Sequence, residues 1–154
     1  MILALALSGA PGAALAQDAG AEAPPYCSDL QQVTALAMTK ERFASIAGKP
    51  REGNFADTRL ALTGWQDCSL YGPATYTCDS PALGSAEAAE AAQARMLHEI
   101  KACLGETWSE AKERSSSRYV VLHSAARPIS ITLSTDETDA KDHIVRLILF
   151  VRRN

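Results

Sequence analysis

The chain has 154 residues, of which 47% are hydrophobic and 21% are charged, and this composition excludes a disordered chain. The formal net charge of −3 argues against nucleic acid as a partner, because binding phosphates requires a basic surface. The length suits one domain with a hydrophobic core that is small enough to gain stability from cross-links.

The N-terminal residues have the features of an export signal. No side chain is charged from Ile2 to Ala16. Ala14 and Ala16 flank Leu15 in the small-x-small pattern that a signal peptidase cleaves. The apolar run is shorter than the roughly 20 residues of a transmembrane helix. The basic residues that usually precede such a segment are missing, so we expect the translated start to lie upstream of this sequence.

These features predict how the chain is divided and where the protein is located. We expect a periplasmic or secreted protein with no integral membrane span after signal cleavage. The predicted segments are a signal peptide over residues 1–16, a flexible leader over residues 17–25 and a single disulfide-stapled α+β domain over residues 26–154.

The cysteines are even in number, which in an exported chain favours disulfides. They are Cys27, Cys68, Cys78 and Cys103. No C-x-x-C motif occurs, and no spacing of Cys and His matches a zinc site. We therefore expect no redox pair, no metal and no cofactor.

A Gly-Pro turn between Cys68 and Cys78 helps to choose among the three ways of pairing the cysteines. If strands flank this turn, Leu70 faces Tyr76 and Cys68 faces Cys78 at a separation close to that of a disulfide. The favoured pairing is therefore Cys68–Cys78 with Cys27–Cys103, and the competing pairing is Cys78–Cys103 with Cys27–Cys68.

The first half of the chain predicts a helix and then two strands. The helix is expected to begin at a capping box formed by Ser28 and Gln31 and to stop at Gly48 and Pro50. Residues 51–57 are predicted as a polar loop. The strand signals that follow are residues 59–65, with a bulge at Gly64, and the hairpin that ends at Cys78.

The second half predicts one long helix and three strands. Ser85 caps a helix that Gly105 ends, and Met96 and Ile100 lie in its apolar stripe. Residues 107–117 are ambiguous between a helical turn and a loop. The predicted strands are residues 118–124, 129–135 and 143–153, and a charged loop over residues 136–142 joins the last two.

The order of these elements, α-β-β-α-β-β-β, predicts an α+β fold. We expect a two-layer domain in which an antiparallel sheet of about five strands carries both helices on one face. Two disulfides are expected to cross-link it.

Apolar residues occur on both faces of the last strand, and this is the feature of the sequence that most strongly indicates an interaction surface. If Val145 and Leu147 face the helices, the residues that face away are Ile144, Ile148 and Phe150. Such a patch is typical of a surface for a protein partner or for a homodimer. The competing interpretation is that a loop or the leader covers it.

No catalytic constellation is recognisable in the sequence, so we expect a non-enzymatic protein. The first hypothesis is an exported binding or accessory protein of the cell envelope, whose partner the sequence does not name. A second hypothesis is a small secreted hydrolase whose site assembles only in three dimensions, for example from His123 and carboxylates. A third is a small-molecule carrier with an apolar cavity between the helices and the sheet.

Overall fold

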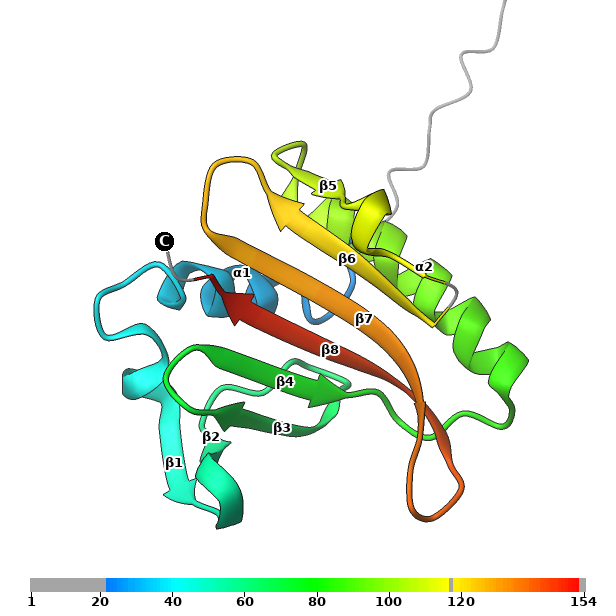
Figure 1. Cartoon of the computed structure of the whole chain (residues 1–154), viewed down its shortest axis with the longest axis horizontal. Coiled ribbons are helices and arrows are strands. Elements are labelled where there is room, and N and C mark those ends of the chain that lie inside the picture. The colour runs from blue at the N-terminus through cyan, green and yellow to red at the C-terminus, as the bar shows by residue number, and fades with distance from the viewer. Residues whose placement is uncertain (1–21, 117, 153–154) are drawn as a thin grey trace, which may run out of the picture.

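The computed structural model describes residues 22–116 and 118–152 of the chain (Figure 1). The predicted signal peptide and residues 17–21 of the predicted leader lie outside the described residues. The helices are α1 (Cys27–Leu36) and α2 (Ala86–Leu104), with short 3-10 helices η1 (Arg42–Ile46), η2 (Glu52–Asn54) and η3 (Lys112–Arg114). The strands are β1 (Ala47–Pro50), β2 (Phe55–Thr58), β3 (Gln66–Tyr71), β4 (Thr75–Asp79), β5 (Trp108–Glu110), β6 (Tyr119–Ser124), β7 (Ile129–Glu137) and β8 (His143–Val151).

The strands of the described residues form one antiparallel sheet in the order β1-β2-β3-β4-β8-β7-β6-β5. Each of the helices α1 and α2 precedes four strands that run as a meander. We call β1–β4 the first meander and β5–β8 the second meander; the two meet where β4 pairs with β8. The predicted two-layer α+β fold is confirmed, but the sheet has eight strands instead of about five.

Both helices cover one face of the sheet, and the core lies between these two layers (Figure 1). The predicted stripe of α2 is confirmed, because Ala92, Met96 and Ile100 are buried. The helix begins where the Ser85 hydroxyl accepts a hydrogen bond from the amide three residues later, at 3.1 Å. It ends at Gly105, whose φ of +82° favours glycine.

The first helix is shorter than predicted. It ends at Leu36, and a turn, η1 and the edge strand β1 follow it. Gly48 does not stop a helix but lies in β1, where an added Cβ atom would stand 2.9 Å from the Cβ of Asp57 in β2. The predicted capping box does not form, because the Gln31 amide donates to the Cys103 carbonyl oxygen at 3.0 Å instead. Close contact between two strands, and not a helix stop, therefore requires glycine at position 48.

Two predictions between α1 and β3 are also wrong. Residues 59–65 form a loop, and their alternating pattern arises because Leu60 and Leu62, two positions apart, both pack against the core from this loop. Gly64 has a φ of +82° in the turn of this loop and is not part of a bulge. Conversely, the predicted polar loop contains the start of β2, which pairs with β3.

The second meander follows the prediction more closely. The three predicted strands correspond to β6, β7 and β8. The ambiguous segment contains the short strand β5, and β7 continues through Glu137 into the predicted charged loop. The loop that joins β7 to β8 is therefore shorter than expected.

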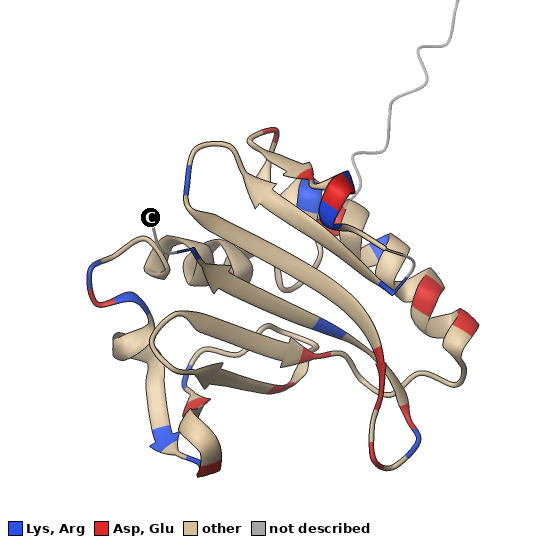
Figure 2. Cartoon of the chain, in the orientation of Figure 1, with Lys and Arg blue, Asp and Glu red and all other residues tan. Residues whose placement is uncertain are grey.

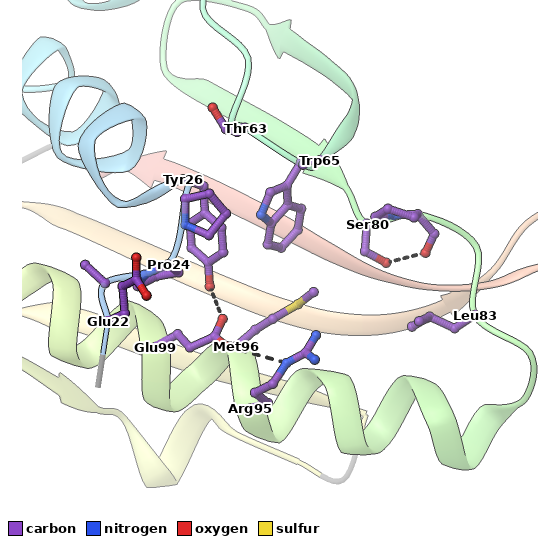
Figure 3. A pocket seen from close by; sticks show the side chains of 14 residues that line it. Glu22, Pro24, Tyr26, Thr63, Trp65, Ser80, Leu83, Arg95, Met96 and Glu99 are labelled. Atoms are coloured by element: carbon purple, nitrogen blue, oxygen red, sulfur yellow. Dashed lines mark hydrogen bonds and ion pairs between the residues drawn. The ribbon is translucent and has the colours of Figure 1, made fainter. Parts of the chain in front are cut away.

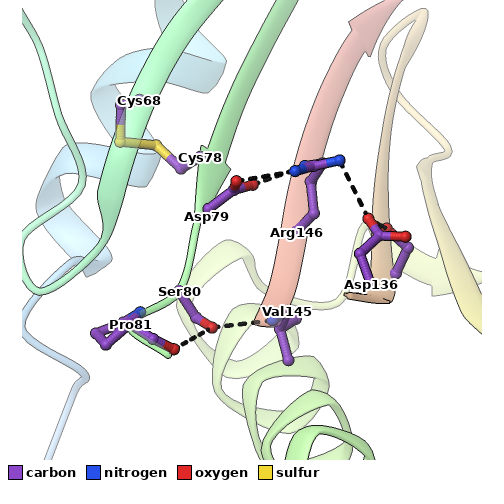
Figure 4. Close-up of polar contacts among 9 residues, drawn as sticks. Cys68, Cys78, Asp79, Ser80, Pro81, Asp136, Val145 and Arg146 are labelled. Carbon is purple, nitrogen blue, oxygen red and sulfur yellow. Dashed lines mark hydrogen bonds and ion pairs between the residues drawn. A yellow bond between two sulfur atoms is a disulfide. The ribbon is translucent and has the colours of Figure 1, made fainter. Parts of the chain in front are cut away.

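Both favoured disulfides are confirmed. Cys68–Cys78 links β3 to β4 within the predicted hairpin, in which Leu70 faces Tyr76 (Figure 4). Cys27–Cys103 links the start of α1 to the end of α2. The two disulfides suggest an oxidising extracellular environment.

Candidate binding groove on the open face of the sheet

The strand register defines the face of the sheet that the helices leave uncovered. Leu147 and Leu149 are fully buried in the core. Ile148 and Phe150 therefore point to the opposite face, which we call the open face, and so do the residues paired with them. One row across the open face contains Phe55, Tyr71, Thr75, Phe150, Ser130, His123 and Ser109. The next row contains Asp57, Ser69, Thr77, Ile148, Thr132 and Val121.

Exposed aromatic side chains gather on the open face. Five large apolar or aromatic side chains are exposed in residues 22–116 and 118–152, and four of them belong to this face. They are Phe55, Tyr71, Tyr119 and Phe150, with exposed fractions of 40%, 47%, 41% and 43%. A concentration of this kind is typical of an interaction surface.

The residues predicted from the last strand differ in accessibility. Phe150 is exposed and Ile148 is half-buried, whereas Ile144 is only 4% exposed and adds little to the surface. Sequence reasoning missed the aromatic residues of β2 and β3. Tyr71 could have been identified from the sequence. Neighbouring residues of a strand face opposite sides of the sheet, so if Leu70 faces the core, Tyr71 faces away from it.

A groove of about 480 Å³ lies on the open face, over β2, β3, β4 and β8. The rings of Phe55 and Tyr71 lie side by side in its lining, with centroids 4.9 Å apart. Ser69, Thr75 and Thr77 line the groove beside these rings. The hydroxyl of Thr77 is buried and has no hydrogen-bond partner among the described residues, so the groove contains an unsatisfied polar atom.

Ion pairs neutralise both arginines of the groove. Arg146 donates hydrogen bonds of 2.7 and 2.9 Å to Asp79 and lies 3.3 Å from Asp136 (Figure 4). The hydrogen bond to Asp79 raises the pKa of Arg146 despite partial burial, so the guanidinium stays protonated. Arg51 pairs with Asp57 in β2. The lining therefore offers no uncompensated cation to an anionic ligand.

A second cleft, of about 680 Å³, lies between α2, the segment before α1 and the loop that carries Trp65 (Figure 3). Tyr26 donates a 2.6 Å hydrogen bond to Glu99, which also pairs with Arg95 at 3.5 Å. Burial and this hydrogen bond raise the pKa of Tyr26, so its phenol stays neutral. A small-molecule carrier would hold its ligand here. Because these polar groups already bind one another and the rings of Tyr26 and Trp65 are buried in the core, we place the candidate site in the groove, whose rings are exposed.

His123 lies on the open face, beyond the groove. Its Nε2 atom is 3.3 Å from the Ser109 hydroxyl of β5, and its Nδ1 atom is buried without a hydrogen bond in the described structure. A Ser-His pair that acts as a nucleophile and base needs an acid at the second ring nitrogen.

The described parts of the chain also hold no cluster of three or more His, Cys, Asp or Glu residues suited to a metal ion.

No family model, curated protein or solved structure matches this chain. Its function therefore has to be inferred from the geometry of the site. Within the residues that the structure describes, neither helix combines the length and the apolar character needed to cross a membrane.

Proposed function

We propose that this protein is an exported, non-enzymatic binding protein of the cell envelope and that the open face of the sheet is its binding surface. The observation that carries the proposal is the gathering of exposed aromatic side chains on this face. Binding surfaces are enriched in aromatic residues, because each ring contributes a large contact area at a low cost in conformational entropy.

The scaffold supports a binding function. Cys68–Cys78 fixes the hairpin that carries Tyr71 and Thr75, and β8 anchors Phe150 in the centre of the sheet. A surface on paired strands loses little freedom on binding, so more of the contact energy appears as affinity. The disulfides are compatible with a periplasmic or a secreted protein, since both compartments are oxidising.

Site-specific photo-cross-linking in the native envelope tests the proposal. A photoreactive amino acid replaces Phe150 in one variant and Met38 in the other. Met38 is a matched control because it is 41% exposed but follows α1 and lies outside the open face. We expect one dominant adduct from position 150 and none from position 38.

The mass of the adduct identifies the partner. An adduct of twice the chain mass would identify a second copy, and a different mass would identify another envelope component. The absence of an adduct at position 150, or the same set of adducts at both positions, would contradict the proposal. Circular dichroism of both oxidised variants would verify that they fold.

A further inference from the structure

The groove on the open face combines two exposed aromatic rings with several hydroxyl groups. The rings of Phe55 and Tyr71 are 40% and 47% exposed and belong to neighbouring strands. The planes of the two rings are inclined by 51°, so together they offer an angled apolar platform, on which each ring presents its own face. The C–H groups on one face of a pyranose ring stack on such a platform, whereas the hydroxyl groups at its rim require polar partners.

The groove supplies such polar partners next to the rings. Thr75 faces Tyr71 across the hairpin, and Ser69 faces Thr77 in the next row. A side-chain hydroxyl both donates and accepts hydrogen bonds, as the hydroxyl of a sugar does. Thr77 gives a specific reason for a ligand, because a buried hydroxyl without a hydrogen-bond partner destabilises the free protein. A change of χ1 rotamer moves this hydroxyl to another staggered position, from which it can bond a ligand in the groove.

The charges in the groove disfavour an anionic ligand. Arg146 is held by two carboxylates and Arg51 by one, so neither attracts an acidic polymer or a phosphate. Asp67 and Asp79 also line the groove, and their carboxylates accept hydrogen bonds. Figure 2 shows other charged residues on α2, on η3, on the segment between α1 and η1 and on the hairpin between β7 and β8.

The sheet also makes a peptide a poor fit to this groove. Peptides commonly bind a sheet by adding a strand to its edge, where main-chain groups are unpaired. The strands β3, β4 and β8 each have a neighbour on both sides, so their main-chain groups are already paired. A ligand of this groove has to be recognised by side chains alone. The volume of about 480 Å³ lies within the range of small-ligand sites and suits a short oligosaccharide.

We propose that this groove binds a neutral oligosaccharide, with a sugar ring on Phe55 and Tyr71 and sugar hydroxyls bonded to Ser69, Thr75 and Thr77. The proposal rests on the proposed binding function and deepens it by naming the class of ligand. The sugar identity is left to experiment, because the aromatic platform and the hydroxyl groups suit several neutral hexoses.

The test is an array of neutral oligosaccharides of glucose and N-acetylglucosamine, together with uronic acid oligosaccharides as anionic probes. The oxidised full chain is applied to the array, and the affinity for the best ligand is then measured by calorimetry. We expect binding to at least one neutral oligosaccharide and no preference for the anionic probes. Because the ligand is neutral, its affinity should change little when the salt concentration is raised.

Three variants and one control locate the site. Phe55→Ala and Tyr71→Ala should each weaken binding by roughly tenfold or more, since each removes part of the platform. Thr77→Val replaces the hydroxyl with a methyl group; it should weaken binding but retain the fold, because the hydroxyl has no partner to lose in the free protein. Tyr119→Ala is the matched control, because Tyr119 is 41% exposed on the same face but does not line the groove. It should bind like the wild-type protein.

The possible outcomes distinguish a failure of the oligosaccharide site from a failure of the proposed binding function. No binding to any neutral oligosaccharide, a preference for the anionic probes, or an equal loss in the Tyr119→Ala variant would overturn the oligosaccharide site. If the array is blank but position 150 cross-links to a polypeptide, the binding function stands and only the ligand class is wrong. If the array is blank and no cross-link forms, both proposals are wrong.

Discussion

The two meanders have the same topology but are held together differently. In the second meander, β7 and β8 have 9 residues each and pair without a register shift. Their core-facing residues, such as Ile131 and Leu147, are fully buried. In the first meander the strands have 4 to 6 residues, and the register shifts both between β1 and β2 and between β3 and β4. Long apolar strands stabilise one half, whereas a disulfide fastens the hairpin of the other.

The candidate groove lies mostly on the less regular half. The aromatic platform belongs to β2 and β3, and only β8 contributes from the second meander. Short and shifted strands leave room for a hollow that two long, regular strands would fill. The comparison supports the proposal that the first meander carries recognition, whereas the second meander provides most of the strand residues that are buried in the hydrophobic core.

The largest expected effect comes from removing the disulfide that joins the two helices. The Cys27→Ala/Cys103→Ala variant should lose about 4.5 kcal/mol of stability, because the bond closes a loop of 76 residues in the unfolded chain. Urea denaturation of the oxidised variant measures this loss. A loss below about 1 kcal/mol would mean that packing of α1 on α2, and not the disulfide, holds the helical layer together.

The hairpin disulfide gives a more direct comparison of the two halves. Cys68→Ala/Cys78→Ala should cost about 3 kcal/mol, because its loop of 10 residues is shorter. Hydrogen exchange should show that the amides of β3 and β4 lose protection while those of β6 and β7 keep it. An equal loss of protection in both meanders would show that they unfold as one unit.

An ion network connects the two meanders through β8. Arg146 binds Asp79 of the first meander and Asp136 of the second, and its side chain is 38% exposed. Arg146→Met should cost about 2 kcal/mol, between the values for exposed and buried pairs, because two carboxylates lose their cation. Urea denaturation measures this loss. In a double-mutant cycle, Asp79→Asn should restore part of the stability of the methionine variant. If Asp79→Asn costs the same in both backgrounds, the pair contributes nothing to stability.

The smallest expected effect is a sensitivity to alkaline pH that arises in the first meander. Burial raises the pKa of Tyr76 above its ordinary value of 10.0, and the nearby Asp29 adds to this shift. The stability contributed by the neutral phenol is therefore present below about pH 10 and is lost as the pH rises towards the folded-state pKa. The urea midpoint should fall above about pH 10 in the wild-type protein and fall less in Tyr76→Phe. Identical pH profiles would contradict this assignment.

The sequence predicted the second meander better because its strands are regular. Residues such as Ile131 and Leu133 alternate with hydroxyl residues. With this pattern only one strand register places all the apolar side chains on the buried face of the sheet. The hairpin of β3 and β4 was also predictable, since the Gly-Pro turn fixes which residues face each other. The confirmed Cys68–Cys78 pairing followed from that geometry.

The first meander was hard to predict because its apolar residues come from loops as well as strands. Leu60 and Leu62 pack against the core from a loop, and their spacing imitates the alternation of a strand. Phe55 lies in a polar stretch, so no local pattern identifies it as a strand residue facing outward. The groove depends on residues from four strands, and their proximity is set by the sheet order, which sequence periodicity does not contain.

The position of β8 has a consequence for how the protein is made. This strand lies in the middle of the sheet but follows all its neighbours in the chain, and it pairs Phe150 with Thr75, which is 75 positions earlier. A nascent chain that emerges from its N-terminus therefore exposes the unpaired edges of β4 and β7 until the joining strand has been synthesised. The sheet is complete only after β8 has been synthesised, and the closing step is a slow pairing of distant segments.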